Sequence, residues 1–588
     1  MLRNVTSDVI DFTTLCAWLS VDYFVEAAQS AASTKQLWSM QLKIAVRESM
    51  GKSTSQRSPS QKVAVIGAGI GGLTAAALLA HRGYSVLVVD QAIVPGGCAS
   101  TFQRRGFTFD VGATQVAGLE PGGIHHRIFT ELNIPLPAAT PCDPACAVFL
   151  PGETEPINVW RDPQRWQAER QQQFPGSEPF WQLLGDLFEA SWAFQARNPV
   201  LPPRSPWDVW QSLRALRPNT LLTVPHTFST VGQVLRWYGL GGDRRLKTFL
   251  DLQLKLYSQV DAEETALLYA ATALGVSQAP QGLFHLQGSM QALSDRLVES
   301  LERDGGTLLM RHTVEQIDTV AQAATDSFDK THSDKTQVSG RNRAIAIRIR
   351  DQKTGHSWTE AADHIVANVT VQNLVQLLGD QSPVGYRQRV EKLPPSSGAF
   401  VVYLGVKQAA IPSHCPPHLQ FLYDYEGAIA ENNSLFVSVS HPSDGRAPTN
   451  CATIIASSFT DPNQWWDADH PETAPSNQIP TSAYQALKQQ YTETAIARLS
   501  QYFDLTPDNI LYQTAATPRT FAQFTGRDRG IVGGIGQRVS TFGPFGFANR
   551  TPISGLWLVG DSTHPGEGTA GVSYSALTVV RQIEAAAF

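Results

Sequence analysis

The sequence has few charged residues, few cysteines and no long hydrophobic run. Asp, Glu, Lys and Arg make up 17% of the 588 residues, and apolar residues make up 42%. So low a charge fraction excludes a disordered chain and a charge-rich coiled coil, because both need many charges. The apolar stretch 266–276 is shorter than the roughly 20 residues that span a bilayer. The net charge of −6 gives no support to a nucleic-acid partner.

Cysteine is too sparse for a disulfide scaffold. Of the six cysteines, only Cys142 and Cys146 lie close together, and no histidine or second cysteine pair completes a zinc pattern. A set of this kind is typical of a reducing compartment. The sequence therefore predicts ordinary thiols and no metal site.

The N-terminal segment differs from the rest of the chain. Short apolar runs alternate with acidic residues up to Met50, so neither a secretory signal nor a transit peptide is indicated. Residues 51–61 are polar and rich in serine, which favours flexibility. We expect residues 1–61 to be a flexible extension, with Met50 as an alternative natural start that would leave 1–49 outside the native protein. The length of the remainder calls for two or more lobes.

The segment 62–90, KVAVIGAGIGGLTAAALLAHRGYSVLVVD, carries the first functional motif. It predicts a buried strand over 63–66, a helix rich in Ala and Leu, and a second strand over 86–89. A strand–helix–strand unit of this kind is typical of an α/β fold with a parallel sheet.

The turn after the first strand has the pattern G-x-G-x-x-G. Gly67 makes the tight turn, Gly69 lets the backbone approach a pyrophosphate, and Gly72 lets helix and strand pack closely. Asp90 ends the second strand, where it can accept hydrogen bonds from a ribose diol. An acid there disfavours NADP, because it would repel a 2′-phosphate. The motif therefore predicts a dinucleotide site.

The other end of the chain favours FAD over NAD. The apolar run 556–559 predicts a strand that leads directly into Gly560 and Asp561. A carboxylate at such a strand end can bind a ribityl hydroxyl, and the small residues that follow let backbone lie close to a ring system. Two strand ends so far apart in sequence, both suited to one nucleotide, indicate a cofactor as long as FAD. Neither 239–244 (GLGGDR) nor 533–538 (GGIGQR) has the G-x-G-x-x-G spacing, so neither indicates a separate NAD(P)H domain.

Four segments (94–118, 288–317, 517–530 and 556–576) resemble the phytoene-desaturase-like family of carotene desaturases and carotenoid cis–trans isomerases. The resemblance extends from about residue 60 to the end and is strongest to the cyanobacterial branch that introduces a 3′,4′ double bond. It implies a glutathione-reductase-type FAD lobe, interrupted by a substrate lobe that sits on a membrane and draws a carotenoid from it. The FAD lobe is expected to comprise 62–115, 282–388 and 545–588, and the substrate lobe 116–281 and 389–544.

The resemblance also implies which residues bind the flavin. These are Gly67, Gly69, Gly72, Asp90, Gly96, Gly97, Val314, Gly560, Asp561 and Val572. Val314 is the position whose backbone pairs with the adenine in the family. Cys98 follows the glycine doublet where the family often has Arg or Lys, so Arg104 or Arg105 either takes that charge or is simply solvated. Asp561 is more typical of the isomerase branch.

Tryptophan gathers in one region. Seven of the 13 tryptophans lie between 160 and 237, together with several arginines and no lysine. Both side chains have an apolar body and a polar edge, which suits contact with lipid headgroups. The same aromatics could line a tunnel for a long polyene, or they could be core residues of a helical lobe. The sequence leaves these three interpretations open.

The expected function is FAD-dependent desaturation at the C-3′,4′ bond of a hydroxylated or acyclic carotenoid end, by a peripheral enzyme on the cytoplasmic side of a thylakoid or plasma membrane. Quinone or oxygen would take the electrons. No motif identifies the proton acceptor; His564 is one candidate and Glu567 is another. The main alternative is a cis–trans isomerase that uses reduced FAD. An amine-oxidase-like flavin oxidase and a carrier without flavin are the other two.

Overall fold

The structure is a computed structural model that describes residues 61–321, 342–466 and 482–586. The expected flexible extension lies outside these residues, apart from Gln61. The chain from Gln61 onward forms one compact unit, so the boundaries expected between two lobes stay a prediction. Among the helices of the described ranges, none has the length and apolar character to cross a membrane.

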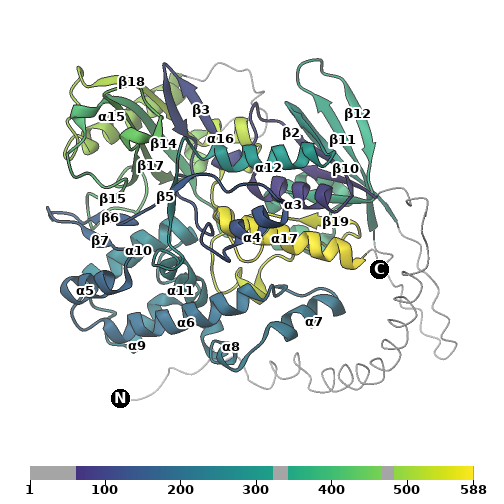
Figure 1. Cartoon of the computed structure of the whole chain (residues 1–588), viewed down its shortest axis with the longest axis horizontal. Coiled ribbons are helices and arrows are strands. Elements are labelled where there is room, and N and C mark those ends of the chain that lie inside the picture. The colour runs from purple at the N-terminus through teal and green to yellow at the C-terminus, as the bar shows by residue number, and fades with distance from the viewer. Residues whose placement is uncertain (1–60, 322–341, 467–481, 587–588) are drawn as a thin grey trace. The chain divides into compact units, whose positions relative to one another are not determined.

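A five-stranded parallel sheet forms the centre of the nucleotide-binding part (Figure 1). Its strands lie in the order β19–β13–β1–β2–β9. Their bounds are β1 Lys62–Ile66, β2 Ser85–Asp90, β9 Thr307–Met310, β13 His364–Ala367 and β19 Leu556–Leu558. The helix predicted after β1 is α3 (Ile70–His81), which crosses over to β2. The predicted α/β fold is confirmed.

Both faces of this sheet are buried, which explains its short, uniformly apolar strands. Val63 and Val65 point to one face, where they pack with α3, α4 (Ile124–Glu131), α12 (Gln291–Arg303) and α17 (Thr569–Ala586). Ala64 and Ile66 alternate with them and pack on the other face. That face is covered by α13 (Val371–Leu378) and by an antiparallel sheet of β10 (His312–Ala321), β11 (Asn342–Asp351) and β12 (Ser357–Ala361).

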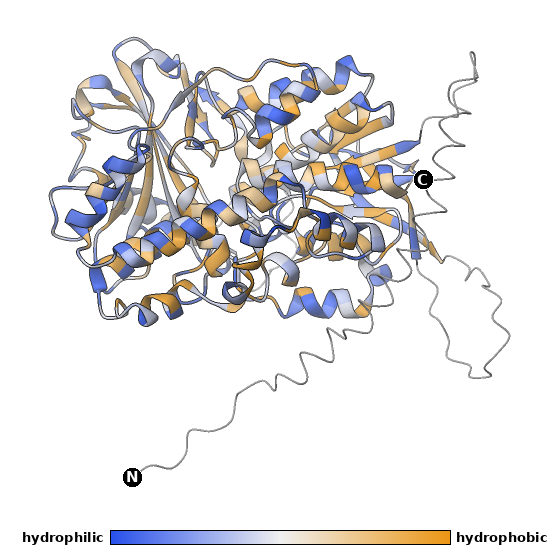
Figure 2. Cartoon of the chain, turned by 60° about the horizontal axis from the view of Figure 1, so that its bottom comes forward, coloured by the Kyte–Doolittle hydropathy of each residue, from blue (hydrophilic) through white to orange (hydrophobic). Residues whose placement is uncertain are grey.

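A seven-stranded mixed sheet lies beside the nucleotide-binding part. Its order is β18–β14–β17–β16–β15–β6–β7. The bounds are β6 Cys146–Phe149, β7 Ile157–Val159, β14 Gly398–Lys407, β15 His418–Leu422, β16 Ser434–Val439, β17 Cys451–Thr460 and β18 Ile510–Ala516. Helix α15 (Ser482–Leu499) packs on one face, and the hairpin of β3 (Thr101–Arg104) and β4 (Phe107–Asp110) packs on the other. Figure 2 shows hydrophobic residues concentrated on these strands.

A helical region completes the molecule along the lower edge of Figure 1. It contains α5 (Pro163–Gln173), α6 (Glu178–Ala196), α7 (Pro206–Ala215), α8 (Pro218–Leu221), α9 (Val231–Trp237), α10 (Arg244–Ser258) and α11 (Leu267–Gly275). The other α-helices and strands of the described residues are α14 (Val384–Glu391), α16 (Pro518–Thr525) and the antiparallel pair β5 (Ala139–Pro141) and β8 (Phe284–Leu286). The helical region, from α5 to α11, contains most of the tryptophan-rich segment 160–237.

The tryptophans of that segment have different environments. Trp166 and Trp181 are buried and stack edge to face. Trp192 lines the main cavity, whereas Trp210 and Trp237 are 60% and 65% exposed. Core packing, cavity lining and exposure are therefore divided among different residues, and no single interpretation of the cluster applies to all of it.

Candidate active site

One cavity of about 1130 Å³ opens at the carboxyl ends of the parallel strands. Gly67 follows β1, Asp90 ends β2, Asn368 follows β13 and Gly560 lies two residues after β19, and all four line the cavity. Ligands of open α/β sheets bind at this edge, because the loops and helix N-termini that follow the strands converge there. The volume exceeds the roughly 300–1,000 Å³ of ordinary small-molecule sites.

The glycine turn after β1 is as compact as the motif predicts. Gly67 has φ +95°, a conformation that disfavours a side chain, and its carbonyl lies only 2.0 Å from where a Cβ on Gly72 would sit. Gly72 does not line the cavity itself but allows α3 to start against the turn. The N-terminus of α3 therefore opens toward the cavity, where its partial positive charge suits a phosphate.

Asn368 is a site residue that the sequence analysis missed. A Cβ on Gly69 would lie 2.8 Å from Asn368 Nδ2, and a Cβ on Gly560 would lie 3.1 Å from its Oδ1. Its amide also donates to the Gly67 carbonyl at 3.4 Å. Asn368 thus packs between the glycine turn after β1 and the loop after β19 and contacts both. The sequence feature that could have identified Asn368 is its position directly after the apolar segment 364–367.

Asp90 is held in place by backbone groups. Its two carboxyl oxygens accept hydrogen bonds from the N–H groups of Ala68 (2.6 Å) and Ala92 (2.7 Å). Burial raises the pKa of Asp90, and these two hydrogen bonds act in the opposite direction. A carboxylate has about four acceptor sites, so Asp90 can still accept from a ribose diol.

Most of the other residues implied by the resemblance also reach the cavity. Gly96, Gly97, Val314, Asp561 and Val572 line it. The first two follow β2, Val314 lies on β10, and Val572 lies in the first turn of α17. The N-terminus of α17 therefore faces the same cavity as that of α3. Their binding roles stay a prediction.

The positive charge near the site comes from Arg527 and not from the hairpin arginines. Arg104 and Arg105 are exposed on the β3–β4 hairpin and do not line the cavity. Arg527 lines it and donates from Nη2 to Asp561 Oδ2 at 2.7 Å. Only the tertiary fold brings the loop after α16 to this place, although 517–530 was among the segments that carried the resemblance.

His564 lines the cavity in the loop between β19 and α17. Its Nε2 lies 3.0 Å from Gln195 Oε1, and its Nδ1 has no hydrogen-bond partner among the described residues. Burial lowers the pKa of His564 to about 4. The imidazole is therefore neutral at pH 7, so an ordinary pKa near neutrality no longer supports its role in proton transfer. The support for that role is that His564 lines the cavity and that its buried Nδ1 has no hydrogen-bond partner among the described residues.

Beyond the strand ends, the cavity continues into an apolar arm. Side chains from α6, α11 and the segment 216–227 line this arm, together with Phe542 and Pro544. They include Trp192, Phe194, Leu216, Val224 and Leu268, and Leu201 from the segment between α6 and α7 also lines the cavity. The cavity thus joins a glycine-rich, polar end to an apolar end of a kind suited to a hydrocarbon chain.

The residues present fit FAD. Asp90 and Asp561 follow strands that are separated by two others, which places them roughly 14 Å apart at about 4.8 Å per strand. An extended dinucleotide is long enough to reach both. Between them, Cβ atoms on Gly67 and Gly69 would come within 2.7 and 2.8 Å of Asn368, so this floor of the cavity accepts backbone only. Two helix N-termini and Arg527 supply positive potential for a pyrophosphate and an electron-rich ring.

Comparison with known proteins agrees with this geometry. A family model described as an NAD(P)-binding Rossmann-like domain matches residues 65–132. The structure of cyclohexylamine oxidase from Brevibacterium oxydans aligns over 90% of this chain and all of its own, with a TM-score of 0.54 at 17% identity. At that identity the match concerns the fold alone, and it confirms the glutathione-reductase-type architecture.

Two curated relatives match most of the chain in sequence. The chloroplastic prolycopene isomerase of Arabidopsis thaliana is 24% identical over 89% of this chain and 82% of its own length. The zeta-carotene-forming phytoene desaturase of Myxococcus xanthus is also 24% identical, over 90% and 95%. The resemblance to carotene desaturases and carotenoid isomerases is therefore confirmed along nearly the whole chain.

Proposed function

We propose that this chain is an FAD-dependent carotenoid desaturase that forms the C-3′,4′ double bond at a hydroxylated or acyclic end. The observation that carries the proposal is the continuous cavity, which joins a dinucleotide groove to an apolar arm. A carotenoid is long and apolar, so it suits that arm. A relative named as a zeta-carotene-forming phytoene desaturase matches 90% of the chain.

Desaturation removes a hydride and a proton from adjacent carbons. When bound, FAD supplies the hydride acceptor. The protein holds it with Asp90, the glycine turn and Asp561, and the apolar arm aligns the polyene and excludes water. The electrons pass finally to a quinone or oxygen.

His564 is the proposed proton acceptor. Gln195 Oε1 accepts from Nε2–H, which leaves a lone pair on Nδ1 without a partner among the described residues. A neutral imidazole can take a proton from the substrate carbon, and the amide of Gln195 fixes which nitrogen is free to do so.

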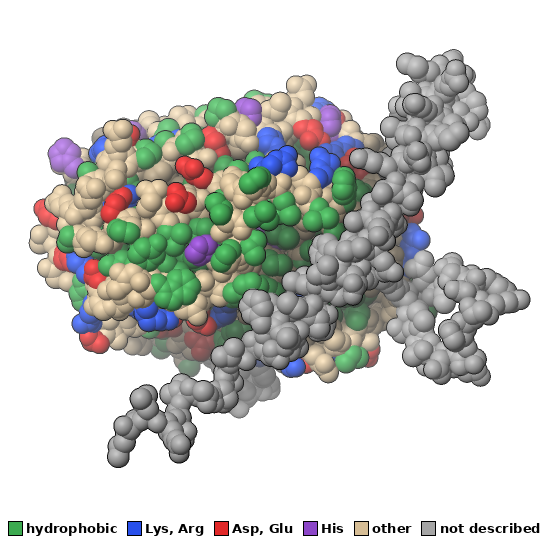
Figure 3. Space-filling model, turned by 90° about the horizontal axis from the view of Figure 1, so that it is seen from below, with side chains coloured by type: hydrophobic (Ala, Val, Ile, Leu, Met, Phe, Trp, Pro, Cys, Tyr) green, Lys and Arg blue, Asp and Glu red, His purple; other side chains and the backbone are tan. Residues whose placement is uncertain are grey.

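Peripheral membrane binding is the second part of the proposal. Figure 3 shows hydrophobic side chains gathered across the lower face of the molecule. The exposed ones on α7 to α9 and the adjoining turns include Val209, Trp210, Leu213, Leu221, Leu222, Val224, Phe228 and Trp237. Val224 also lines the cavity, so this surface lies at the apolar arm and could receive a carotenoid directly from lipid.

Arginines beside this surface favour an anionic membrane. Burial lowers the pKa of Arg197, and the positive charge of Arg217 nearby lowers it further. Burial and the charge of Arg204 lower the pKa of Arg389 in the same way. Among the described residues, no carboxylate forms an ion pair with these four; Arg197, for example, donates to the Ala215 carbonyl and Thr220 Oγ1. Their uncompensated charge suits lipid phosphates on the cytoplasmic side of a membrane.

Cis–trans isomerisation is the second candidate. The observation that favours it is Asp561, which is typical of the isomerase branch and which Arg527 holds at the cavity wall. Relatives named prolycopene isomerase match 89% of the chain. An isomerase would leave the mass of the carotenoid unchanged.

The product decides between the two. Liposomes carrying a 1′-hydroxylated γ-carotene type, lycopene or poly-cis lycopene are incubated with the FAD-loaded protein and a quinone. A product lighter by two hydrogens, with absorption at longer wavelength, is the expected result. Unchanged mass with loss of the cis absorption band would make the protein an isomerase. No change in any pigment would contradict both proposals.

A further inference from the structure

A second cavity, of about 400 Å³, lies between α4 and α17 and shares no lining residue with the active-site cavity. Helix α4 contributes Arg127 and Glu131, and α17 contributes Arg581 and Glu584. Arg82, the residue directly after α3, lines it as well. Three arginines and two glutamates give this α4–α17 cavity a net positive charge.

One arginine compensates the two glutamates. Arg82 Nη2 donates to Glu131 Oε1 at 2.7 Å, and Arg82 Nη1 donates to Glu584 Oε2. Both carboxylates of the cavity are thus paired with the same side chain, which leaves the charges of the other two arginines uncompensated.

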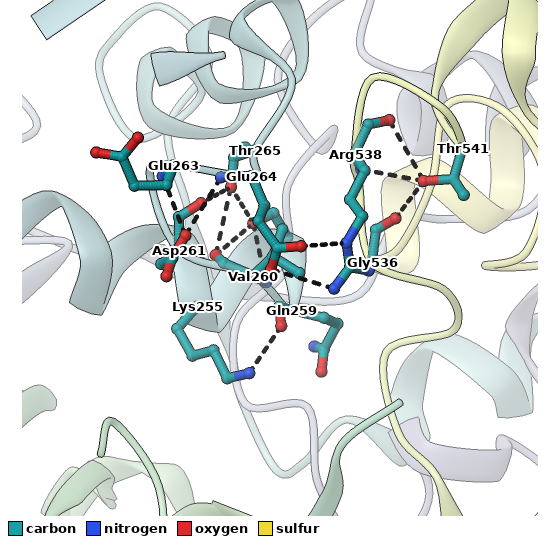
Figure 4. A network of polar contacts seen from close by, with 11 residues as sticks. Lys255, Gln259, Val260, Asp261, Glu263, Glu264, Thr265, Gly536, Arg538 and Thr541 are labelled. Atoms are coloured by element: carbon teal, nitrogen blue, oxygen red, sulfur yellow. Dashed lines mark hydrogen bonds and ion pairs between the residues drawn. The ribbon is translucent and has the colours of Figure 1, made fainter. Parts of the chain in front are cut away.

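Arg127 and Arg581 have no carboxylate partner among the described residues, although their neighbours bind them closely. Arg538 shows the contrasting case: its Nε and Nη2 both donate to Glu264, at 2.8 and 3.2 Å (Figure 4). An arginine paired in that way has its charge compensated within the protein. The charges of Arg127 and Arg581 remain for a ligand.

A single residue, Asn198, holds both guanidinium groups. Its Oδ1 accepts from Arg127 Nη2 at 2.8 Å, and its backbone carbonyl accepts from Arg581 Nη1 at 2.9 Å. Helix α7 fixes the second arginine further, because Gln211 Oε1 accepts from Arg581 Nη2 at 2.7 Å and the Trp207 ring lies 5.5 Å from its Cζ. The two groups are therefore held close together at the cavity before a ligand binds.

Hydrogen-bond donors remain on both arginines. A guanidinium has five N–H donors, whereas the contacts above use one nitrogen of Arg127 and two of Arg581; the Tyr574 hydroxyl is a further neighbour of Arg127. Both side chains are half-buried, and in the described part of the chain no nitrogen of either is both buried and without a partner. The donors that remain are therefore accessible to a group in the cavity.

The electrostatics favour an anion. Burial lowers the pKa of Arg581 to about 10, and the charges of Arg214, Arg127 and Arg82 lower it further, while Glu584 acts in the opposite direction. Several like charges held together are unfavourable unless an opposite charge lies among them. A bound anion would supply that charge.

We infer that the α4–α17 cavity binds a phosphate group, which Arg127 and Arg581 hold through charge-assisted hydrogen bonds. The planar guanidinium presents paired N–H donors that match the oxygens of a phosphate. A phosphate monoester carries up to two negative charges, which suits two arginines without carboxylate partners. A soluble phosphate ester and the headgroup of a phospholipid both carry this group, and the experiment distinguishes them.

The first measurement is made in solution. The affinity of the FAD-loaded protein for inorganic phosphate and for glycerol phosphate is measured by titration calorimetry, in chloride buffer of constant ionic strength. Arg127→Gln and Arg581→Gln should each weaken saturable binding by about tenfold or more, because each removes hydrogen bonds to a charged group. Arg581→Lys keeps the charge beside Glu584 but loses the paired donors, so it should retain only part of the affinity.

The second measurement uses membranes. Phosphatidylcholine vesicles carry either phosphatidic acid, a phosphate monoester, or phosphatidylglycerol, a diester, in amounts matched for surface potential. If the phosphate belongs to a lipid, flotation should recover more wild-type protein with phosphatidic acid, and Arg581→Gln should remove the difference. If it belongs to a soluble ester, the two vesicles should bind equally and only the calorimetric signal should appear.

Arg350→Gln is the matched control. Arg350 lies on β11 outside both cavities, is exposed, and has its own partner in Glu315, with 3.7 Å between nitrogen and oxygen. The variant loses the same charge, so it should leave phosphate affinity and vesicle preference unchanged. An equal loss in Arg350→Gln would show general attraction by net charge and overturn the inference.

Unchanged flavin absorption and an unchanged thermal transition without phosphate exclude misfolding of the variants. Should Arg581→Gln fail to fold, Arg581→Lys carries the test, with a several-fold loss of affinity expected and an unaltered affinity overturning the inference. Wild-type protein that binds neither soluble phosphate nor phosphatidic acid selectively would also overturn it. The calorimetric measurement needs no carotenoid, turnover or membrane, so its outcome is independent of the proposed function.

Discussion

Arg527 Nη2 donates to Asp561 Oδ2 at 2.7 Å, and this ion pair joins the loop after α16 to the loop after β19 at the wall of the cavity. Both side chains are less than one-fifth exposed. A buried charge that loses its partner is costly. We therefore expect the pair to contribute to stability and to set the charge at this wall of the cavity.

Arg527→Gln is expected to destabilise the protein by about 3 kcal/mol, because Asp561 keeps its burial and loses its partner. The loss is measured by urea denaturation, and flavin retention is followed on a desalting column. The double variant with Asp561→Asn should recover much of the stability, because no isolated charge remains. A single variant as stable as wild type would show that the pair carries little energy.

Gly72→Ala should prevent flavin binding and destabilise the fold. The added Cβ would lie 2.0 Å from the Gly67 carbonyl, a backbone atom that cannot move without opening the turn. Gly185→Ala is the control, since it lies within α6 with no atom near the new Cβ, and it should stabilise the protein by roughly 0.5–1 kcal/mol. Retained flavin absorption in purified Gly72→Ala would contradict the account of the turn.

His564→Gln should lower kcat by about 100-fold or more with little change in flavin content, because a general base is lost while the cavity is kept. Turnover is followed by the loss of two hydrogens in the carotenoid mass. Gln195→Leu should give a smaller loss, since it removes only the group that orients the ring. If His564→Gln turns over at the wild-type rate, the proton goes elsewhere.

Trp210→Glu and Leu222→Glu should each weaken binding to anionic vesicles by about tenfold, because each replaces an exposed apolar side chain with a charge. Flotation with vesicles measures the bound fraction. Val320→Glu on β10 is the control, as Val320 is also exposed but lies in the three-stranded sheet. Equal effects at all three positions would refute docking through α7 and α8, and added salt should weaken wild-type binding.

His418 should make stability depend on pH. Burial, with His285 and Arg446 nearby, lowers the pKa of His418 to about 3. Between about pH 6.5 and 3 the unfolded chain binds a proton that the folded protein does not. The free energy of unfolding therefore falls as pH falls through this window, by at most about 1.4 kcal/mol per pH unit.

His418→Phe removes this contribution and suits the site, because the ring already stacks on Phe436 at 6.0 Å. Urea denaturation at pH 7.5, 6 and 5 is expected to show a shallower decline for the variant than for wild type. Parallel declines would show that His418 titrates normally in the folded protein.

Local patterns predicted the central fold correctly. The expected strands at 63–66, 86–89 and 556–559 are β1, β2 and β19, because short runs of buried apolar residues between glycines and acids have few other stable arrangements. The glycine turn and the position of Asp90 were predicted in the same way, from residues that are close together in the chain. A dinucleotide site could be inferred from these residues since one strand–turn–helix unit contains most of it.

The opposite end of the site depended on tertiary structure. Three residues of the site, Arg527, Asn368 and Gln259, come from separate segments, and none belongs to a motif whose spacing indicates its role. The hairpin arginines looked suited to the charge near Cys98 but point elsewhere, because β3 and β4 pair with each other outside the cavity. Tertiary packing likewise decided which tryptophans lie in the core, which line the cavity and which are exposed.

The sequence by itself determined a parallel α/β sheet, a glycine turn after β1, and the acids Asp90 and Asp561 at the ends of two strands. These features depend on contacts between neighbours in the chain. Only the tertiary structure decided that Arg527 meets Asp561, which polar side chains line the cavity and which apolar side chains stay exposed. Those outcomes depend on the packing of segments hundreds of residues apart, and hydrophobic periodicity carries no record of the partner that each face will meet.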